Sequence, residues 1–386
     1  MENLKKKLTI NKMDNKINET AHNMINYVKE RAKTMTFITI SITICVISTI
    51  LLILWIQSKM TLENRNCNKL NNYYKNFPPI SNIKINTKNE GLRDYYIKTA
   101  FNCCATGSIK NDYVSICALE NCIKQGVRCL DFEIYSMDNN PVIAVSSSNK
   151  FNIKESFNKI HFSEALNIVS RAFSSSYAPN PNDPLILHFR IMTDNMLILD
   201  KMAYSIKDKL RMHILDKKYS YEYNKRNIGK VKLENLLKKV IIIVDKSKAN
   251  PNKTKLDEYV NLTSNSMFMR NIPFHDVKYS PDFQELIEYN KQNMTMCYPD
   301  LKINMVNPPP PIIKASGCQF IAMSFQNIND NLKYYNKIFN DEGSAFILKP
   351  ENLRHKPVFI KKPPPARKEL SYETRKIKED YFELDM

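Results

Sequence analysis

An uncharged apolar run of 22 residues, 35–56 (MTFITISITICVISTILLILWI), constrains this chain more than any other feature. As an α-helix it would reach about 33 Å, which is enough to cross the ~30 Å hydrocarbon core of a bilayer. The sole tryptophan, Trp55, lies at its far end, where an aromatic ring favours the membrane interface. A cleaved signal peptide is the competing interpretation, but the run is long, starts late and lacks a small-x-small cleavage site. We therefore predict a single-pass membrane protein.

The orientation of this helix stays open because two observations disagree. The first 34 residues carry eight Lys or Arg against four acids, but Lys59, Arg65 and Lys69 lie close to the other end of the run. The positive-inside rule then favours a cytoplasmic N-terminus only weakly. The nine cysteines show neither zinc spacing nor the spacing of a small disulfide scaffold. Scattered thiols in a large domain are typical of a reducing compartment. Sequons such as Asn252-Lys253-Thr254 and Asn293-Met294-Thr295 are expected by chance in an Asn-rich chain.

The formal net charge of +18 concerns partners rather than fold. A basic domain held at a bilayer would be attracted to anionic phospholipids. The alternative is that lysines are simply spread over a solvated surface, since the chain is rich in Asn, Lys and Ile. That bias indicates an AT-rich genome, such as that of a protist or a large DNA virus, and the membrane would then be a host or virion membrane. No nucleic-acid reading motif accompanies the basic segments, so we expect no nucleic-acid partner.

The chain beyond the apolar run divides by composition and periodicity. We predict a basic N-terminal tail at 1–34, the transmembrane helix at 35–56, a polar tether at 57–91, a polar linker at 247–264 and a charged C-terminal tail at 361–386. Short apolar runs predict strands at 128–135, 141–145, 185–191 and 240–244, and again within 317–326 and 346–348. Helical spacing lies between them at 162–173 and 196–215. Strand, helix and strand in succession indicate parallel β/α units.

Several short blocks then resemble motifs of one enzyme family. They are TAFNCCATG (99–107), GVRCLDFE (126–133), PLILHFR (184–190), NKQNMTMCYP (290–299), GCQ with FQ (317–326) and LKP (348–350). In this order and spacing they resemble the X and Y halves of the phosphoinositide-specific phospholipase C family. The resemblance implies a TIM-like (β/α)8 barrel with an X half at 92–246 and a Y half at 265–360. The active site of such a barrel lies at the carboxyl ends of its strands.

The same resemblance implies a phosphodiester cleavage that uses two histidines and a Ca²⁺ ion, and several of those positions are changed here. Phe101 and Val145 stand at the two histidine positions, and neither can donate a proton. Of the Ca²⁺ ligands, the asparagine is present as Asn102. The family's glutamate and aspartate pair appears as Asp131 and Glu133, so both carboxylates are present with their side-chain lengths exchanged. Arg190 replaces the third carboxylate. We expect its guanidinium to take the place of the cation and to pair with Asp131 and Glu133.

On the substrate side, Tyr298 fits the tyrosine that packs on the inositol ring in the family. Met296 replaces a phosphate-binding arginine, and Lys246 is the sole residue that could substitute for the headgroup lysines. We therefore expect weak headgroup binding or none. His188 is the best candidate for a relocated catalytic imidazole, because it precedes Arg190 by two on one strand and so shares its face. A hydrogen-bonded structural role is the commoner alternative for such a histidine.

These observations favour a membrane-anchored, catalytically inactive phospholipase C-like protein that binds lipid or an unknown protein, without a cofactor. One alternative is an active phosphoinositide phosphodiesterase with remodelled acid and base groups, which would need Ca²⁺. Another is a structural viral membrane protein that keeps the barrel only as a scaffold. Ca²⁺-dependent release of inositol phosphate would separate the first alternative from the other two hypotheses.

Overall fold

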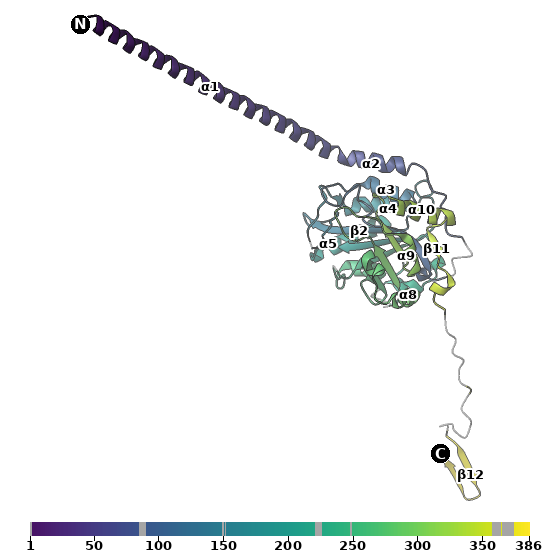
Figure 1. Cartoon of the computed structure of the whole chain (residues 1–386). Coiled ribbons are helices and arrows are strands. Elements are labelled where there is room, and N and C mark those ends of the chain that lie inside the picture. Colours follow the sequence, from purple (N-terminus) through teal and green to yellow (C-terminus); the bar gives the residue numbers. More distant parts are fainter. Residues whose placement is uncertain are drawn as a thin grey trace.

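A computed structural model describes the protein over residues 2–84, 90–148, 150, 152–220, 226–247, 249–356, 364 and 374–386. The long helix α1 (Glu2–Met60) projects away from a domain that holds the remaining elements up to residue 356 (Figure 1). Within α1 the segment Asn15–Met60 is long and apolar enough to cross a membrane, because it contains an 18-residue window with a mean hydropathy of 2.7, none of which is buried. It contains the predicted run 35–56 and is a candidate membrane span.

The domain is a nearly closed barrel of eight parallel strands surrounded by helices, as the sequence predicts. The strands, in ladder order, are β7 (Leu262–Ser264), β6 (Val240–Asp245), β5 (Leu185–Ile191), β2 (Cys129–Met137), β1 (Tyr95–Ala100), β10 (Phe320–Met323), β9 (Met294–Tyr298) and β8 (Met269–Pro273). Residues 265–268 join β7 directly to β8, with no helix between them. Three shorter strands pair antiparallel at the edges: β3 (Asn140–Ile143), β4 (Ile160–His161) and β11 (Phe346–Leu348).

Both faces of the barrel strands are buried, one inside the barrel and one under the helices. This explains why β5 and β6 are continuous apolar runs rather than alternating ones. The surrounding helices are α3 (Ile116–Lys124), α4 (Phe162–Ser170), α5 (Met196–Leu210), α7 (Phe274–Lys278), α8 (Phe283–Gln292), α9 (Pro310–Ala315) and α10 (Asp330–Glu342). The ends of α10 follow local rules, because the Asn329 side chain accepts from the Leu332 N–H and Gly343 ends the helix at a φ of 64°.

The predicted polar tether at 57–91 is not a simple tether. The helix α1 continues to Met60, and a second helix, α2 (Leu62–Tyr73), packs against α3. Leu70 and Tyr74, four residues apart, are buried against the barrel. Cys67 also forms a disulfide with Cys117 at the start of α3. The reducing-compartment argument therefore fails for this pair. Composition alone indicated a loop because most of the exposed face of α2 is polar.

Two other predicted segments also differ in the structure. The predicted linker 247–264 contains a 3₁₀ helix (Lys255–Tyr259), and it ends in β7, which pairs with β6 inside the barrel wall. The strand was missed because three residues, Leu262–Ser264, are too short to show a period. Within the predicted tail 361–386, β12 (Lys376–Glu379) and β13 (Phe382–Asp385) form an antiparallel hairpin. Residues 361–363 and 365–373 of that tail lie outside the described part of the chain.

Candidate functional site at the mouth of the barrel

Two neighbouring strands bring four polar side chains to the same place. Asp131 and Glu133 lie two apart on β2, so their side chains share one face. The parallel ladder sets Asp131 opposite His188 and Glu133 opposite Arg190 on β5. All four residues are at least nine-tenths buried. The register of two strands therefore assembles two carboxylates, an imidazole and a guanidinium within one layer near the carboxyl ends of the strands.

The Arg190 guanidinium lies between the two carboxylates. Its Nη2 is 2.9 Å from Asp131 Oδ2, and its Nη1 is 3.4 Å from Glu133 Oε2. Its Nε donates to Asp131 Oδ1 at 3.1 Å. Nη2 also donates to Asn102 Oδ1 at 2.5 Å. The pairing that the sequence analysis expected from this arginine is thus present, and it includes the asparagine as a third partner.

Asn102 reaches this cluster because of an unusual backbone conformation. It lies two residues after the end of β1 and has a φ of 47°, a left-handed conformation that asparagine tolerates better than most residues. This turn directs the Asn102 N–H toward Asp131 Oδ2, at 3.1 Å, while its side-chain oxygen accepts from Arg190. The Asn102 side-chain nitrogen is buried without a hydrogen-bond partner. The asparagine therefore serves the arginine and the aspartate together.

The cluster shifts the pKa of each charged member according to its partners. Burial opposes the charge of Asp131, but the Arg190 charge and the His188 hydrogen bond outweigh it and hold the pKa of Asp131 below its ordinary value. Burial raises the pKa of Glu133 despite the opposing charge of Arg190. Burial also works against Arg190, yet Asp131 and Glu133 raise the pKa of Arg190 above its ordinary value. The guanidinium is therefore permanently charged.

His188 is held at both ring nitrogens. Its Nδ1 is 2.7 Å from Asp131 Oδ1, and its Nε2 is 2.9 Å from the Ser264 hydroxyl on β7. The ring is completely buried. The sequence pattern indicates the histidine but not Ser264, since that residue lies in the predicted linker. Both nitrogens are already in hydrogen bonds, which is the arrangement of a structural histidine.

Glu133 has a further partner that the sequence analysis missed. The Tyr135 hydroxyl donates to Glu133 Oε1 at 2.5 Å, and the Ser146 N–H is 3.4 Å from Glu133 Oε2. Burial and the nearby Glu133 charge raise the pKa of Tyr135 above its ordinary value. The signal was available, because Tyr135 continues the alternation of Asp131 and Glu133 on the same strand face.

Phe101, at the first histidine position, packs on the guanidinium. The Arg190 Cζ lies 4.5 Å from the centre of the Phe101 ring, in cation–π range. Phe101 also stacks on Tyr298, with ring centres 5.3 Å apart and planes 7° from parallel. Burial raises the pKa of Tyr298 to about 12. The ring of Tyr298, which the resemblance assigns to an inositol ring, is therefore stacked on a side chain of the protein itself.

The remaining predicted residues do not join this cluster. Val145 is buried, and its carbonyl accepts from the Glu155 and Ser156 N–H groups at 2.9 and 3.2 Å. Met296 is fully buried on β9, opposite Phe320 of β10. Lys246 follows β6 and is exposed, and its N–H donates to the Ser264 carbonyl at 3.0 Å. The structure thus unites seven predicted residues: Phe101, Asn102, Asp131, Glu133, His188, Arg190 and Tyr298.

The donor set at the mouth does not fit Ca²⁺. This ion takes six to eight oxygen ligands, from carboxylates, carbonyls and water. Here the oxygens of Asn102, Asp131 and Glu133 that face one another accept hydrogen bonds or ion pairs from Arg190. A divalent cation in the same space would meet a fixed positive charge. Among the described residues no group of three or more His, Cys, Asp and Glu side chains is placed to hold a metal ion.

A parallel barrel with its buried polar groups at the carboxyl ends of the strands is the architecture of TIM-barrel enzymes and their relatives. The model of the phosphatidylinositol-specific phospholipase C X domain matches residues 88–246, and that of the Y domain matches residues 237–352. The two matches together cover about two thirds of the chain. This protein therefore belongs to the phosphatidylinositol-specific phospholipase C family.

Solved structures agree with this assignment at the level of the fold. PLC21 from L. pealei is 19% identical, with a TM-score of 0.59, and the match covers 69% of this chain and 38% of that one. PLC21 from S. officinalis is also 19% identical, with a TM-score of 0.58 and the same coverage of both chains. The chain thus spans about two fifths of the length of these two relatives.

Proposed function

We propose that this chain is a membrane-anchored phospholipase C-like protein without phosphodiesterase activity, which acts as a binding module. The observation that carries the proposal is the position of Arg190, whose guanidinium is hydrogen-bonded to Asn102 and Asp131 and paired with Glu133. In the family, by resemblance, these positions surround the Ca²⁺ ion. A guanidinium cannot act as the Lewis acid that lowers the pKa of a substrate hydroxyl.

The loss of acid and base groups supports the same proposal. The two positions expected to carry histidine hold Phe101 and Val145, both buried. His188 lies beside the cluster, but its two nitrogens are bonded to Asp131 and Ser264. A general acid must reach the leaving group within hydrogen-bond distance and carry a transferable proton. A fully buried imidazole with both nitrogens engaged does not meet this requirement.

The way α1 joins the domain supports a position at the membrane surface. The Asn66 amide of α2 donates to Asp112 at 2.9 Å, in the segment that follows the carboxyl end of β1. Lys59, at the end of α1, lies 5.6 Å from the ring of Phe157, in the segment that follows β3. The candidate membrane span therefore leaves the domain at the mouth of the barrel. Exposed apolar side chains occur in the same segments and in the one after β9: Ile153, Phe157, Ile303 and Val306.

The ligand of this module is a separate question, for which the chain offers two candidates. The net charge of +18 supports attraction to anionic phospholipids, at roughly 1 kcal/mol per basic residue near the surface. An unidentified protein partner is the other candidate. Binding of the purified chain to neutral vesicles and to vesicles with phosphatidylserine distinguishes them. A lipid ligand requires affinity that rises with the anionic fraction and falls with salt.

The experiment that tests inactivity uses the purified full chain in phosphatidylinositol-containing vesicles, with Ca²⁺ or with a chelator. We expect no release of inositol phosphate in either condition, and no effect of Ca²⁺ on the melting temperature. Ca²⁺-dependent release that disappears in Asp131→Ala would overturn the proposal. The matched control is Glu285→Ala, which removes an exposed carboxylate remote from the mouth. If its activity also disappeared, the loss would reflect folding and not the site.

A further inference from the structure

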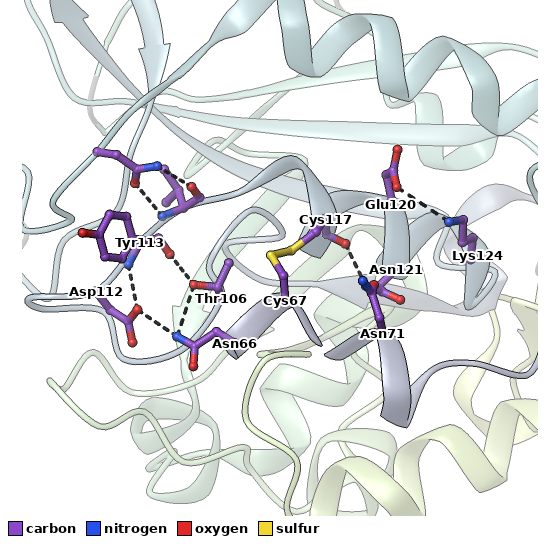
Figure 2. The surroundings of a disulfide bond; sticks show 12 residues. Asn66, Cys67, Asn71, Thr106, Asp112, Tyr113, Cys117, Glu120, Asn121 and Lys124 are labelled. Atoms are coloured by element: carbon purple, nitrogen blue, oxygen red, sulfur yellow. Dashed lines mark hydrogen bonds and ion pairs between the residues drawn. A yellow bond between two sulfur atoms is a disulfide. The ribbon is translucent and has the colours of Figure 1, made fainter. Parts of the chain in front are cut away.

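Two half-buried cysteines join the membrane-proximal helix to the barrel. Cys67 of α2 and Cys117 of α3 form a disulfide with a Cα–Cα distance of 5.9 Å, across 50 residues of sequence (Figure 2). Side-chain hydrogen bonds flank it on both sides. Asn66 donates to Asp112 at 2.9 Å, and Asn121 donates to the Asn71 side-chain oxygen at 2.7 Å. The disulfide is therefore part of a docked helix pair and is not a chance approach of two flexible segments.

The other cysteines of the chain are placed differently. Six of them are buried in the domain as free thiols: Cys103, Cys104, Cys122, Cys129, Cys297 and Cys318. Burial raises the pKa of Cys122 and Cys297, for example, which keeps these groups as unreactive thiols. Cys45 lies within the apolar run of α1. The two cysteines of the domain that solvent reaches are thus the two that are joined. This pattern is typical of a domain that folds in an oxidising compartment.

The charges beside the apolar run agree, more weakly, with a barrel on the oxidising side of the membrane. Eight Lys or Arg lie in the first 34 residues, whereas Lys59, Arg65 and Lys69 follow the run closely, so the positive-inside rule favours a cytoplasmic N-terminus only weakly. A single span then places the barrel on the opposite side, in the lumen of the secretory pathway or outside the cell. Phosphatidylserine and phosphoinositides are concentrated in the cytoplasmic leaflet. A barrel on the other side would be separated from them, which leaves the unidentified protein partner as the candidate ligand of the binding module.

The three N-glycosylation sequons of the domain differ in how exposed their asparagine side chains are. Asn252 is exposed in the turn 251–254, where the Thr254 N–H donates to the Pro251 carbonyl at 3.0 Å. Asn261 is buried, and its amide bonds the Ile242 N–H and the Tyr219 carbonyl. The Asn293 side-chain oxygen accepts from Asn227, and its partner Thr295 is fully buried. Of these three domain sequons, Asn252 alone presents a free and exposed acceptor.

We propose that the barrel lies on the lumenal or external side of the membrane and that Asn252 is an N-glycosylation site. The donor would be an oligosaccharide linked to a polyprenyl diphosphate. The Asn252 amide nitrogen forms a bond to C1 of the first sugar and loses a proton, while the C1–O bond breaks and the lipid diphosphate leaves. Joining Cys67 to Cys117 releases two protons and two electrons, which a disulfide-bearing oxidoreductase of that compartment accepts. The sidedness rests on the anchor in the proposed function.

The test expresses the full chain in eukaryotic cells and measures an endoglycosidase-sensitive mobility shift. We expect a shift of one glycan in the unaltered chain, its loss in Asn252→Gln and its retention in Thr254→Ser, which keeps the sequon. Asn293→Gln is the matched control and keeps the shift. Asn18 belongs to a fourth sequon, Asn18-Glu19-Thr20, on the other side of the apolar run. A shift that Asn18→Gln abolishes would show the opposite orientation and overturn the proposal.

Two further measurements distinguish a failure of the proposed sidedness from a failure of the proposed membrane anchor. Alkaline carbonate extraction reports whether the chain is integral to the membrane, and maleimide labelling without reductant reports whether Cys67 and Cys117 are oxidised. An integral chain without a glycan and with two additional reactive thiols overturns the sidedness and leaves the anchor intact. A glycosylated chain that carbonate extracts supports the sidedness of the barrel and contradicts the anchor. An extracted chain without a glycan contradicts both.

Discussion

Buried cations occur in two regions of this barrel, and their surroundings differ. Arg190, at the mouth, is paired with Asp131 and Glu133, which raise its pKa. Lys98, on β1, is fully buried and donates to the Gln125 carbonyl at 2.8 Å, and burial lowers its pKa to about 7. Lys349, after β11, donates to the Asn290 and Gly317 carbonyls, and burial likewise lowers its pKa to about 7.

The difference shows that burial alone does not decide the state of a charged group. Carbonyl oxygens supply hydrogen bonds but only partial charges, so they do not offset the desolvation of an ammonium group. Two carboxylates do offset the desolvation of a guanidinium. The mouth therefore holds a permanent positive charge, that of Arg190, between Asp131 and Glu133.

The largest effect is expected from Arg190→Leu. Removal of the guanidinium leaves Asp131 and Glu133 buried without a counter-charge, which costs about 3–5 kcal/mol of the free energy of unfolding. Denaturant unfolding of the solubilised chain measures this cost. The companion variant Arg190→Leu with Asp131→Asn and Glu133→Gln is expected to recover much of it, because the uncompensated charges are gone. A triple variant as unstable as the single one would show that packing, and not charge, holds the mouth together.

A smaller effect concerns the pH dependence of stability through Lys98. The folded chain loses this proton near pH 7, whereas the unfolded chain keeps it up to the ordinary value of 10.5. Between these pH values the unfolded state binds more protons, so the free energy of unfolding rises with pH, by about 1.4 kcal/mol per unit for this group. Lys98→Met removes that contribution. We expect its pH dependence between pH 7 and 8.5 to be lower by about 2 kcal/mol over the window.

The control for this prediction is Lys150→Met, which removes an exposed lysine. It is expected to leave the pH dependence unchanged. The window ends at pH 8.5 because the buried thiols have raised pKa values, and their contribution lowers stability above the ordinary pKa of cysteine. Equal slopes for the unaltered chain and Lys98→Met would mean that Lys98 keeps its proton in the folded state.

A third effect isolates the aromatic ring over the guanidinium. Phe101→Leu removes both the contact with Arg190 and the stacking on Tyr298. The matched control is Phe339→Leu, because Phe339 is equally buried and packs on Tyr335 with ring centres 4.9 Å apart. We expect Phe101→Leu to lower the free energy of unfolding by about 1 kcal/mol more than the control. Equal costs would show that the ring acts only by filling space.

The smallest effect is expected for an arginine pair at the surface. Arg270 binds Glu285 through two hydrogen bonds of 2.9 and 2.7 Å, with geometry as good as that of Arg190. Both side chains are more than a third exposed. Arg270→Leu should therefore cost less than about 1 kcal/mol, and the cost should fall with salt. A cost as large as that of Arg190→Leu would contradict the view that burial of the partners sets the difference.

Much of the fold followed from short-range patterns. The strands β2, β5 and β6 and the helices α4 and α5 lie where the apolar runs and helical spacing predicted them. The motif blocks predicted the barrel and the changed positions at its mouth. Patterns failed for β7, which is three residues long, and for α2, whose buried residues are too few to give an apolar stripe. Both are stabilised by contacts with segments far away in the sequence.

The sequence by itself determined the apolar run that can span a membrane, the family of the barrel and the absence of imidazole at two expected positions. These depend on residue identity and local spacing. Only the tertiary structure decided that Arg190 lies between Asp131 and Glu133, that Cys67 meets Cys117, and that Asn252 is exposed while Asn261 is buried. The physical reason is that such contacts depend on strand register and helix docking, which bring together residues that are distant along the chain.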